Sequence, residues 1–277
     1  MTTAREGREL LIGEDRLARL TRDLEAAHRE TLPAMRAGAV DLAEEIRATG
    51  REAGPDTAEA GLGRRRFLLG AGGAAAGLAL AACSSDKTGA SSTKAAGAPA
   101  TTASPSASSQ YSGDLKVVAL AVALENQAVG VYLATLAAAK AGRLGTVPPA
   151  ITTFVTTAMA QHVDHAKAWN AVLTGAGVPP IRNVPLSNQA ATAAELAKAR
   201  TYTDVAKLAL QLEGQAAQTY LFATYNVKST AGIETAATIA PVEAMHAAIL
   251  HFVLGQYPVP DDFLPTDKAA DPALLTV

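Results

Sequence analysis

Apolar side chains recur at helical spacing over most of the chain beyond residue 113, and Gly and Pro residues interrupt the pattern. The uninterrupted segments predict long helices over about 114–141, 150–175, 203–226 and 231–256, with a short helix over 190–199. Pro241 should kink the fourth long helix or mark its true start. Because the connections are short, long and short in turn, we expect an all-α four-helix bundle over residues 114–257, with one long crossover between its second and third helices.

The two halves of this region resemble each other. The segment Leu124–Ala128 reads Leu-Glu-Asn-Gln-Ala and recurs at Leu212–Ala216 as Leu-Glu-Gly-Gln-Ala, and a tyrosine follows each segment at the same spacing. The segment His162–His165 aligns in part with Glu243–His246. A high alanine content does not explain Glu, Gln and Tyr in a shared register, so the region reads as a duplicated helical hairpin.

Residues 1–62 form a charged leader. Leu17, Leu20 and Leu24 recur at helical spacing within Glu14–Glu30, which predicts a short amphipathic helix. We expect the leader to be a solvated helix or a disordered segment on the cytoplasmic side, and His28 within it to take no part in a site. A shorter protein that starts at Met35 is an alternative.

An export signal is predicted over residues 63–83. Arg64 and Arg65 precede the apolar run Phe67–Ala82, an order typical of twin-arginine signals. This run is shorter than the roughly 20 residues that span a bilayer. It closes with Leu-Ala-Ala and Cys83, which resembles a bacterial lipobox. We therefore expect passage through the twin-arginine translocon and a lipoprotein anchored through Cys83 to the outer face of the cell membrane.

The segments on either side of the bundle differ from it in composition. Residues 84–113 are almost all Ser, Thr, Ala, Gly and Pro. Such a segment cannot bury enough apolar surface to offset its ordering entropy, so we expect a flexible linker. Residues 258–277 form a C-terminal tail.

Charge and cysteine content exclude several classes of function. The chain has 24 Lys and Arg residues against 26 Asp and Glu residues, a formal net charge of -2, which argues against nucleic-acid binding. Its single cysteine excludes an internal disulfide framework and a thiolate metal cluster.

Three glutamates stand alone in apolar helices. Glu125, Glu213 and Glu243 each lie near the middle of a predicted helix, with no other Asp, Glu, Lys or Arg within five residues on either side. Burial of an unpaired carboxylate costs several kcal/mol or forces it to take a proton. The partners that the bundle offers are three histidines: His162, His165 and His246. Three acids and three imidazoles without a fixed cation imply that a cation is bound from outside.

Helical spacing supports a common site. Residues three apart share a helix face, so Glu243 and His246 can point at one centre, as can His162 and His165. One Glu from each of two helices and a Glu-x-x-His pair from each of two others is the di-metal pattern of ferritin-like bundles. This sequence supplies the pattern with one change, because His162 stands where a glutamate is expected.

These motifs resemble the ferritin-like domain family of exported bacterial proteins, whose relatives include plant desiccation-related proteins. The resemblance implies that the metal is iron, as one or two ions, or manganese. Because His162 removes one potentially bridging carboxylate, zinc, copper or a single iron would also suit the site. The implied metal ligands are Glu125, His162, His165, Glu213, Glu243 and His246.

We expect a membrane-tethered extracytoplasmic metal-binding protein with iron- or manganese-dependent oxidative chemistry, with ferroxidase, peroxide-handling and oxidase activities all open. The alternative is a non-enzymatic envelope stress or interaction module with a degenerate site. A lipid on every subunit argues against a storage cage, whereas a smaller homo-oligomer stays open. We interpret Tyr132, Tyr220 and Trp169 as core residues, Gln161 as a group behind the ligands and Asp164 as exposed.

Overall fold

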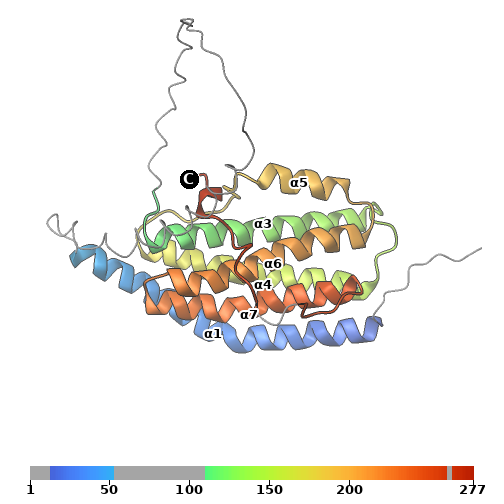
Figure 1. Ribbon diagram of the computed structural model, residues 1–277, viewed down its shortest axis with the longest axis horizontal. Coiled ribbons are helices and arrows are strands. Elements are labelled where there is room, and N and C mark those ends of the chain that lie inside the picture. The colour runs from blue at the N-terminus through green and yellow to red at the C-terminus, as the bar shows by residue number, and fades with distance from the viewer. Residues whose placement is uncertain (1–12, 53–109, 261–263) are drawn as a thin grey trace, which may run out of the picture. The chain divides into compact units, whose positions relative to one another are not determined.

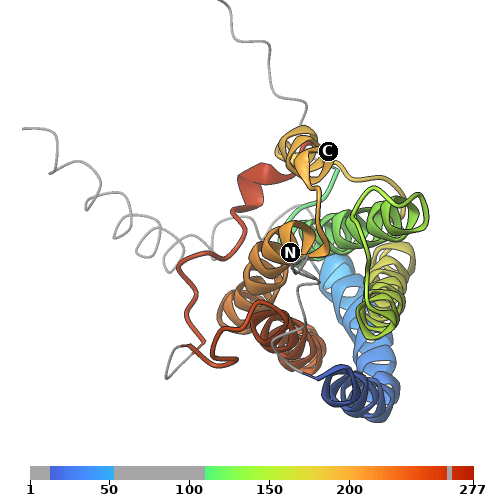
Figure 2. The ribbon, with the colours of Figure 1, turned by 90° about the vertical axis from the view of Figure 1, so that its right-hand side faces the viewer.

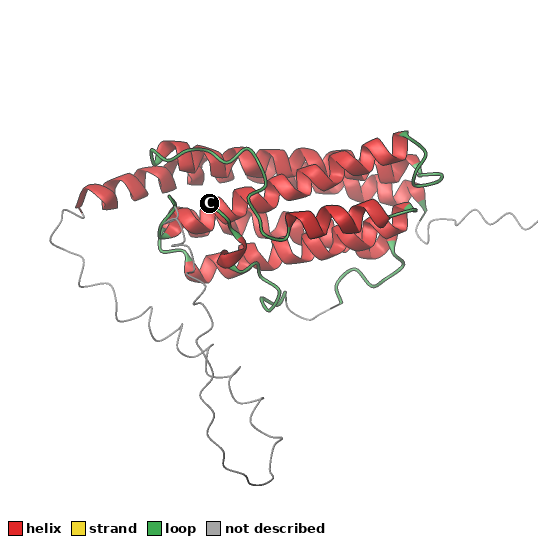
Figure 3. Ribbon diagram, turned by 90° about the horizontal axis from the view of Figure 1, so that it is seen from above, coloured by secondary structure: helices red, strands yellow, loops and turns green. Residues whose placement is uncertain are grey.

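The computed structural model describes residues 13–52, 110–260 and 264–277, and these residues are helical without a β-strand (Figure 3). The helices are α1 (Glu14–Glu52), α3 (Asp114–Lys140), α4 (Pro149–Gly175), α5 (Gln189–Lys198), α6 (Tyr202–Asn226), α7 (Thr230–Val253) and the 3-10 helix η1 (Pro272–Leu274). The expected all-α fold is confirmed, and beyond residue 113 each predicted helix end lies within three residues of the observed one.

Two helical hairpins, α3–α4 and α6–α7, lie side by side and form the bundle (Figures 1 and 2). The long crossover between them contains α5. At the start of α6, Thr201 and Asp204 form a capping box, and Ser229 Oγ accepts the backbone N–H of Gly232 at the start of α7. Since α7 continues through Pro241 to Val253, this proline does not mark the true start of the helix.

Two helices of the bundle, α3 and α7, are unusually apolar because much of their surface is buried in the core. By length and composition alone, α3 and α7 could each cross a membrane, but 61% and 50% of their most apolar windows are buried inside the protein. These are the only two such helices in the part of the chain that the structure describes. Core helices of a soluble bundle have the same composition, so the observation is weak evidence for membrane insertion.

Helix α1 packs along the bundle. Leu17, Leu24, Met35 and Leu42 are each at most 2% exposed, and they belong to the same hydrophobic clusters as the bundle helices. The compact unit that holds the bundle includes α1 as far as Arg47. This part of the leader is therefore neither solvated nor disordered, and its helix is longer than the sequence indicated.

Several sequence predictions concern residues outside the described ones. The export signal with Arg64, Arg65, Phe67 and Cys83 lies there, as do residues 84–109 of the expected linker.

The last residues of that linker and the C-terminal tail contact the bundle. Tyr111 is buried, and its hydroxyl donates to the carbonyl of Pro179 at 2.9 Å. In the tail, the backbone N–H of Thr276 donates to the carbonyl of Pro185 at 2.9 Å.

Candidate metal centre

Four helices bring six polar side chains together inside the bundle. All six are buried, with at most 2% of each residue exposed. They are Glu125 on α3, His162 and His165 on α4, Glu213 on α6, and Glu243 and His246 on α7. The two pairs three residues apart share a helix face, as their spacing predicts. The structure thus gathers every metal-ligand candidate that the sequence indicated.

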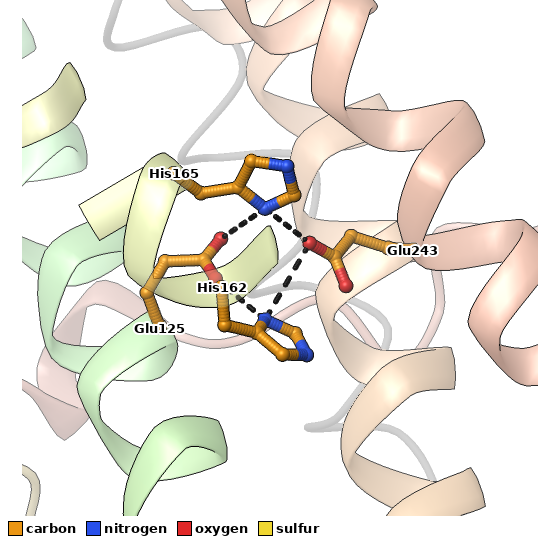
Figure 4. A group of neighbouring side chains, drawn as sticks. All are labelled: Glu125, His162, His165 and Glu243. Carbon is orange, nitrogen blue, oxygen red and sulfur yellow. Dashed lines mark hydrogen bonds and ion pairs between the residues drawn. The ribbon is translucent and has the colours of Figure 1, made fainter. Parts of the chain in front are cut away.

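The first group of possible ligands consists of Glu125, His162, His165 and Glu243 (Figure 4). His162 Nδ1 lies 2.7 Å from Glu125 Oε2, and His165 Nδ1 lies 2.8 Å from Glu243 Oε1. One ligand atom from each of the four side chains lies within 4.8 Å of the others. The spacing allows one metal ion to contact all four.

The second group consists of His162, Glu213, Glu243 and His246. His162 Nε2 lies 3.1 Å from Glu213 Oε1, and His246 Nδ1 lies 3.2 Å from one oxygen of each glutamate. The two groups share His162 and Glu243. His162 turns Nδ1 to the first group and Nε2 to the second, and Glu243 divides its two carboxylate oxygens in the same way.

Mutual contacts set the charges of these side chains in the metal-free chain. Burial lowers the pKa of His165, but the carboxylates of Glu125 and Glu243 outweigh it and raise that pKa to about 9. Burial raises the pKa of Glu125, but the imidazoles of His165 and His162 outweigh it and lower that pKa to about 2. Protonated histidines therefore neutralise the carboxylates. A bound metal ion would replace those protons, because it binds the neutral imidazole.

A buried nitrogen atom without a partner and a close ion pair show that the residues fit a metal ion. His165 Nε2 has no hydrogen-bond partner among the described residues, and His165 Nδ1 contacts Glu243 Oε1 as an ion pair at 2.8 Å. Burial of a polar atom without a partner costs about 1–3 kcal/mol. A metal ion held by His165 Nδ1 and Glu243 Oε1 would replace the proton that the two atoms share in this ion pair. Carboxylate and imidazole together suit iron and manganese, and a histidine-rich set also suits zinc and copper.

Each single glutamate is held by a tyrosine from the other hairpin. Tyr132 of α3 donates to Glu213, and Tyr220 of α6 donates to Glu125. Trp169 Nε1 in turn donates to Tyr220 Oη at 2.9 Å. From the sequence, the two tyrosines were expected to be core residues. They are buried, but they also orient the two carboxylates, and no spacing within one helix could have shown a contact between hairpins.

A small cavity adjoins the centre on the side of α3 and α6. It has a volume of about 20 Å³, and its lining includes Glu125, Glu213 and His162 together with Ala128 and Ala216. That volume holds about one water molecule. The small side chains thus leave room beside the carboxylates.

A larger cavity, of about 660 Å³, lies outside α6 and α7, against the C-terminal tail. His251 is in its lining, and the six candidate ligands are not. This cavity therefore does not open onto the centre.

Helix α1 reaches the centre from outside the bundle. Gln161 Nε2 donates to Glu25 Oε2 at 2.8 Å, and Gln161 Oε1 lies 2.9 Å from His246 Nε2. The ring of His28, which is only 3% exposed, meets the ring of His165 edge-on at 5.2 Å between centroids. His28 thus contacts a candidate ligand but belongs to neither donor group. No pattern in the sequence indicates these contacts, because more than a hundred residues separate the partners.

Asp164 links the same helix to α4. Its carboxylate lies 3.7 Å from His28 Nε2 and 3.6 Å from Arg36, and its side chain is 26% exposed. Asp164 is thus partly covered by α1 and is not the exposed residue that the sequence predicts.

The family model for the ferritin-like domain matches residues 90–256, more than half of the chain. No curated protein and no solved structure matches the chain significantly. The matched residues contain the four bundle helices and all six candidate ligands, whereas α1 lies outside the match. Fold, donor set and sequence match agree, and the chain belongs to the ferritin-like domain family.

Proposed function

We propose that this chain binds iron, as one or two ions, or manganese in its bundle and uses the metal for oxidative chemistry outside the cytoplasm. The observation that carries the proposal is the pair of adjacent donor groups that share His162 and Glu243. Buried carboxylates and imidazoles at this density are otherwise costly. The ferritin-like fold and the donor set both favour a metal ion as the missing partner.

The chemistry would divide between metal and protein. A bound iron or manganese ion with open coordination positions would supply the electron-transfer step with dioxygen or peroxide. The chain itself holds Glu125 and Glu213 through Tyr220 and Tyr132, and it excludes bulk water by burial. Ferroxidase, peroxide-handling and oxidase activities all belong to this proposal. Zinc or copper is the competing choice of metal, because His162 adds an imidazole to the site.

The extracytoplasmic location is the second part of the proposal. Arg64, Arg65, the apolar run from Phe67 and Cys83 precede the bundle in the order that a twin-arginine lipoprotein signal requires. The partners would be the translocon and, through the lipid at Cys83, the membrane. Since the twin-arginine route carries folded proteins, the bundle could acquire its metal before export.

One observation favours a different function. His162 takes the place of a glutamate, so the centre has three carboxylates instead of four. A site that had lost its metal would leave a non-enzymatic envelope stress or interaction module on the same bundle. Metal content separates this alternative from the proposed function.

The decisive experiment measures bound metal. We expect the full chain, after anaerobic addition of Fe(II) or Mn(II) and removal of free ions, to retain about one or two ions per chain. Glu243→Gln should abolish retention, because Glu243 serves both donor groups. Glu234→Gln, at an exposed position of the same helix, is the matched control. Less than about a tenth of an ion per chain would contradict the proposal, since a structural or catalytic metal binds close to stoichiometrically.

Two further experiments test the remaining parts. Oxygen or peroxide consumption by the iron-loaded chain, absent in Glu243→Gln, would separate an oxidative protein from a metal-binding module. For export, Arg64→Lys with Arg65→Lys should keep the protein in the cytoplasm, and Cys83→Ala should abolish lipid labelling. Unchanged export or labelling would refute the proposed location.

A further inference from the structure

Helix α1 buries one continuous face along the bundle. Its buried residues recur three, four or seven positions apart, which is the spacing of one helix face. They include Leu17, Thr21, Leu24, His28, Met35, Ala39 and Leu42. This buried face therefore spans most of α1. Such a face is typical of a helix that packs against a protein surface, and a helix surrounded by solvent does not have one.

The surface that receives α1 belongs to α4 and α7 and is shaped for close contact. A Cβ atom at Gly38 of α1 would lie 2.5 Å from Thr235 Oγ1 on α7. A Cβ atom at Gly175, the last residue of α4, would lie 2.7 Å from Ala43 Cβ. Figure 2 shows α1 beside both of these helices. Since side chains larger than those present would clash on both sides, this groove fits α1 closely.

The middle of α1 lies over the metal centre. Glu25 holds Gln161, which contacts His246, and His28 packs against His165. In the first donor group, His165 thus contacts α1 directly. In the second, His246 contacts Gln161, which is hydrogen-bonded to α1. With α1 docked, both histidines are 0% exposed. The helix therefore covers the histidine side of the centre.

The position of α1 in the sequence sets it apart from the bundle. The helix precedes the predicted export signal, and the family match begins only at residue 90. Cleavage before Cys83 would remove α1 from the chain, while all six candidate ligands would stay. A segment that covers the centre in the full chain would then be missing from the exported protein.

We propose that the α4/α7 groove is a docking surface for α1 that is occupied only before processing, and that cleavage before Cys83 uncovers the histidine side of the metal centre. The full chain is then the closed form and the anchored protein the open one. The release step rests on the proposed export, whereas the covering contact does not. The occupant of the groove is residues 14–47 of the same chain.

The covering contact is tested in the purified, metal-free full chain by hydrogen exchange with mass spectrometry. Leu24→Asp places a charge on the buried face of α1, and Ala26→Asp places the same charge on its exposed face. We expect Leu24→Asp to speed exchange about tenfold or more in α4 around His162 and in α7 around Glu243, because undocking lowers local stability. Ala26→Asp should leave both segments unchanged.

A second pair of variants keeps the test decisive if Leu24→Asp unfolds the whole chain. In Gly38→Val, the new side chain would clash with Thr235. The control is Ala37→Val, which places the same side chain at the preceding, solvent-exposed position. Gly38→Val should reproduce the faster exchange in α4 and α7, with the helical circular dichroism retained. Equal exchange in both members of a folded pair would overturn the covering contact.

The release step is tested on the protein isolated from membranes with its lipid anchor. We expect its N-terminus at Cys83, no peptides from residues 14–47, and exchange in α4 and α7 as fast as in Leu24→Asp. Cleavage at Cys83 with α1 still bound would overturn the release while leaving the proposed function intact. An anchored chain that keeps residues 1–82 would refute both the cleavage and the release of α1. The covering contact is tested separately, by the exchange experiments on the full chain.

Discussion

The two hairpins of the bundle place corresponding side chains at corresponding points of the centre and differ at one of them. Glu125 in the first hairpin corresponds to Glu213 in the second, and each accepts a hydrogen bond from a tyrosine of the other. In the α4 and α7 helices, however, His162 corresponds to Glu243. Both of these side chains lie between the two donor groups and offer one atom to each.

A side chain at this position can therefore contact both donor groups without bringing a negative charge to them. An imidazole has two nitrogen atoms on opposite sides of its ring, so His162 can face both donor groups as a carboxylate does. It brings no negative charge, and it carries a proton in the metal-free chain because the carboxylates of Glu213 and Glu243 outweigh the effect of burial and raise its pKa. A second divalent ion is therefore attracted less strongly than it would be by four carboxylates.

The largest effect should come from Glu243, the shared carboxylate of the second hairpin. We expect Glu243→Ala to weaken metal binding by more than the roughly 10- to 100-fold that follows loss of an outer partner, because both donor groups lose a ligand. Competition with a chelating dye measures the change. Glu234→Ala should bind as the parent does, and equal affinity of the two variants would refute the role of Glu243.

A glutamate at position 162 would give the two hairpins the same residue at the shared position and remove the difference in charge between them. His162→Glu introduces a fourth carboxylate, so we expect a higher metal-to-protein ratio, closer to two ions per chain. Without metal, the same variant should lose about 3–5 kcal/mol of stability, because buried carboxylates lose a cationic partner. Denaturant unfolding with and without Mn(II) measures both effects. A metal-free variant as stable as the parent would contradict the charge argument.

Tyr132 and Tyr220 should contribute unequally to the stability of the fold, although they occupy corresponding positions. Tyr132→Phe and Tyr220→Phe each remove a donor to a buried carboxylate, at a cost of about 1–3 kcal/mol. Tyr220→Phe should cost more, because Trp169 Nε1 also loses its acceptor. Chemical denaturation of both single variants tests the order. The reverse order would show that the Trp169 hydrogen bond does not stabilise the fold.

The smallest effect concerns the starts of the helices in the second hairpin. Thr201→Ala should cost about 1 kcal/mol of folding stability, because it removes the capping box of α6.

Hydrogen bonds from the backbone of Arg200 and from Thr201 lower the pKa of Asp204. Asp204 thus stabilises the fold at pH values above its unfolded pKa, and this contribution is lost as the pH falls through the lowered folded pKa. Unfolding at pH 7 and pH 3 compares the parent with Asp204→Asn, and an equal loss at both values would contradict the cap.

Local spacing in the sequence was enough for most of the fold and for the six candidate ligands. The helical period placed every bundle helix, and single glutamates in apolar helices marked Glu125, Glu213 and Glu243. The three-residue spacing of His162 and His165 put both on one face of α4. These features depend only on neighbours within a few turns, so a sequence displays them directly. The export signal stays a prediction, since Arg64, Arg65, Phe67 and Cys83 lie outside the described residues.

Contacts between side chains on different helices follow only from the tertiary packing. The structure shows that His162 serves both donor groups, that Tyr132 reaches Glu213, and that α1 docks over the centre. The sequence pattern predicted a solvated or disordered leader in place of α1, because the apolar face of this segment is narrow and its charged residues are many. Whether such a face is buried depends on a complementary surface, and that surface belongs to α4 and α7, which follow α1 in the chain by about a hundred residues or more.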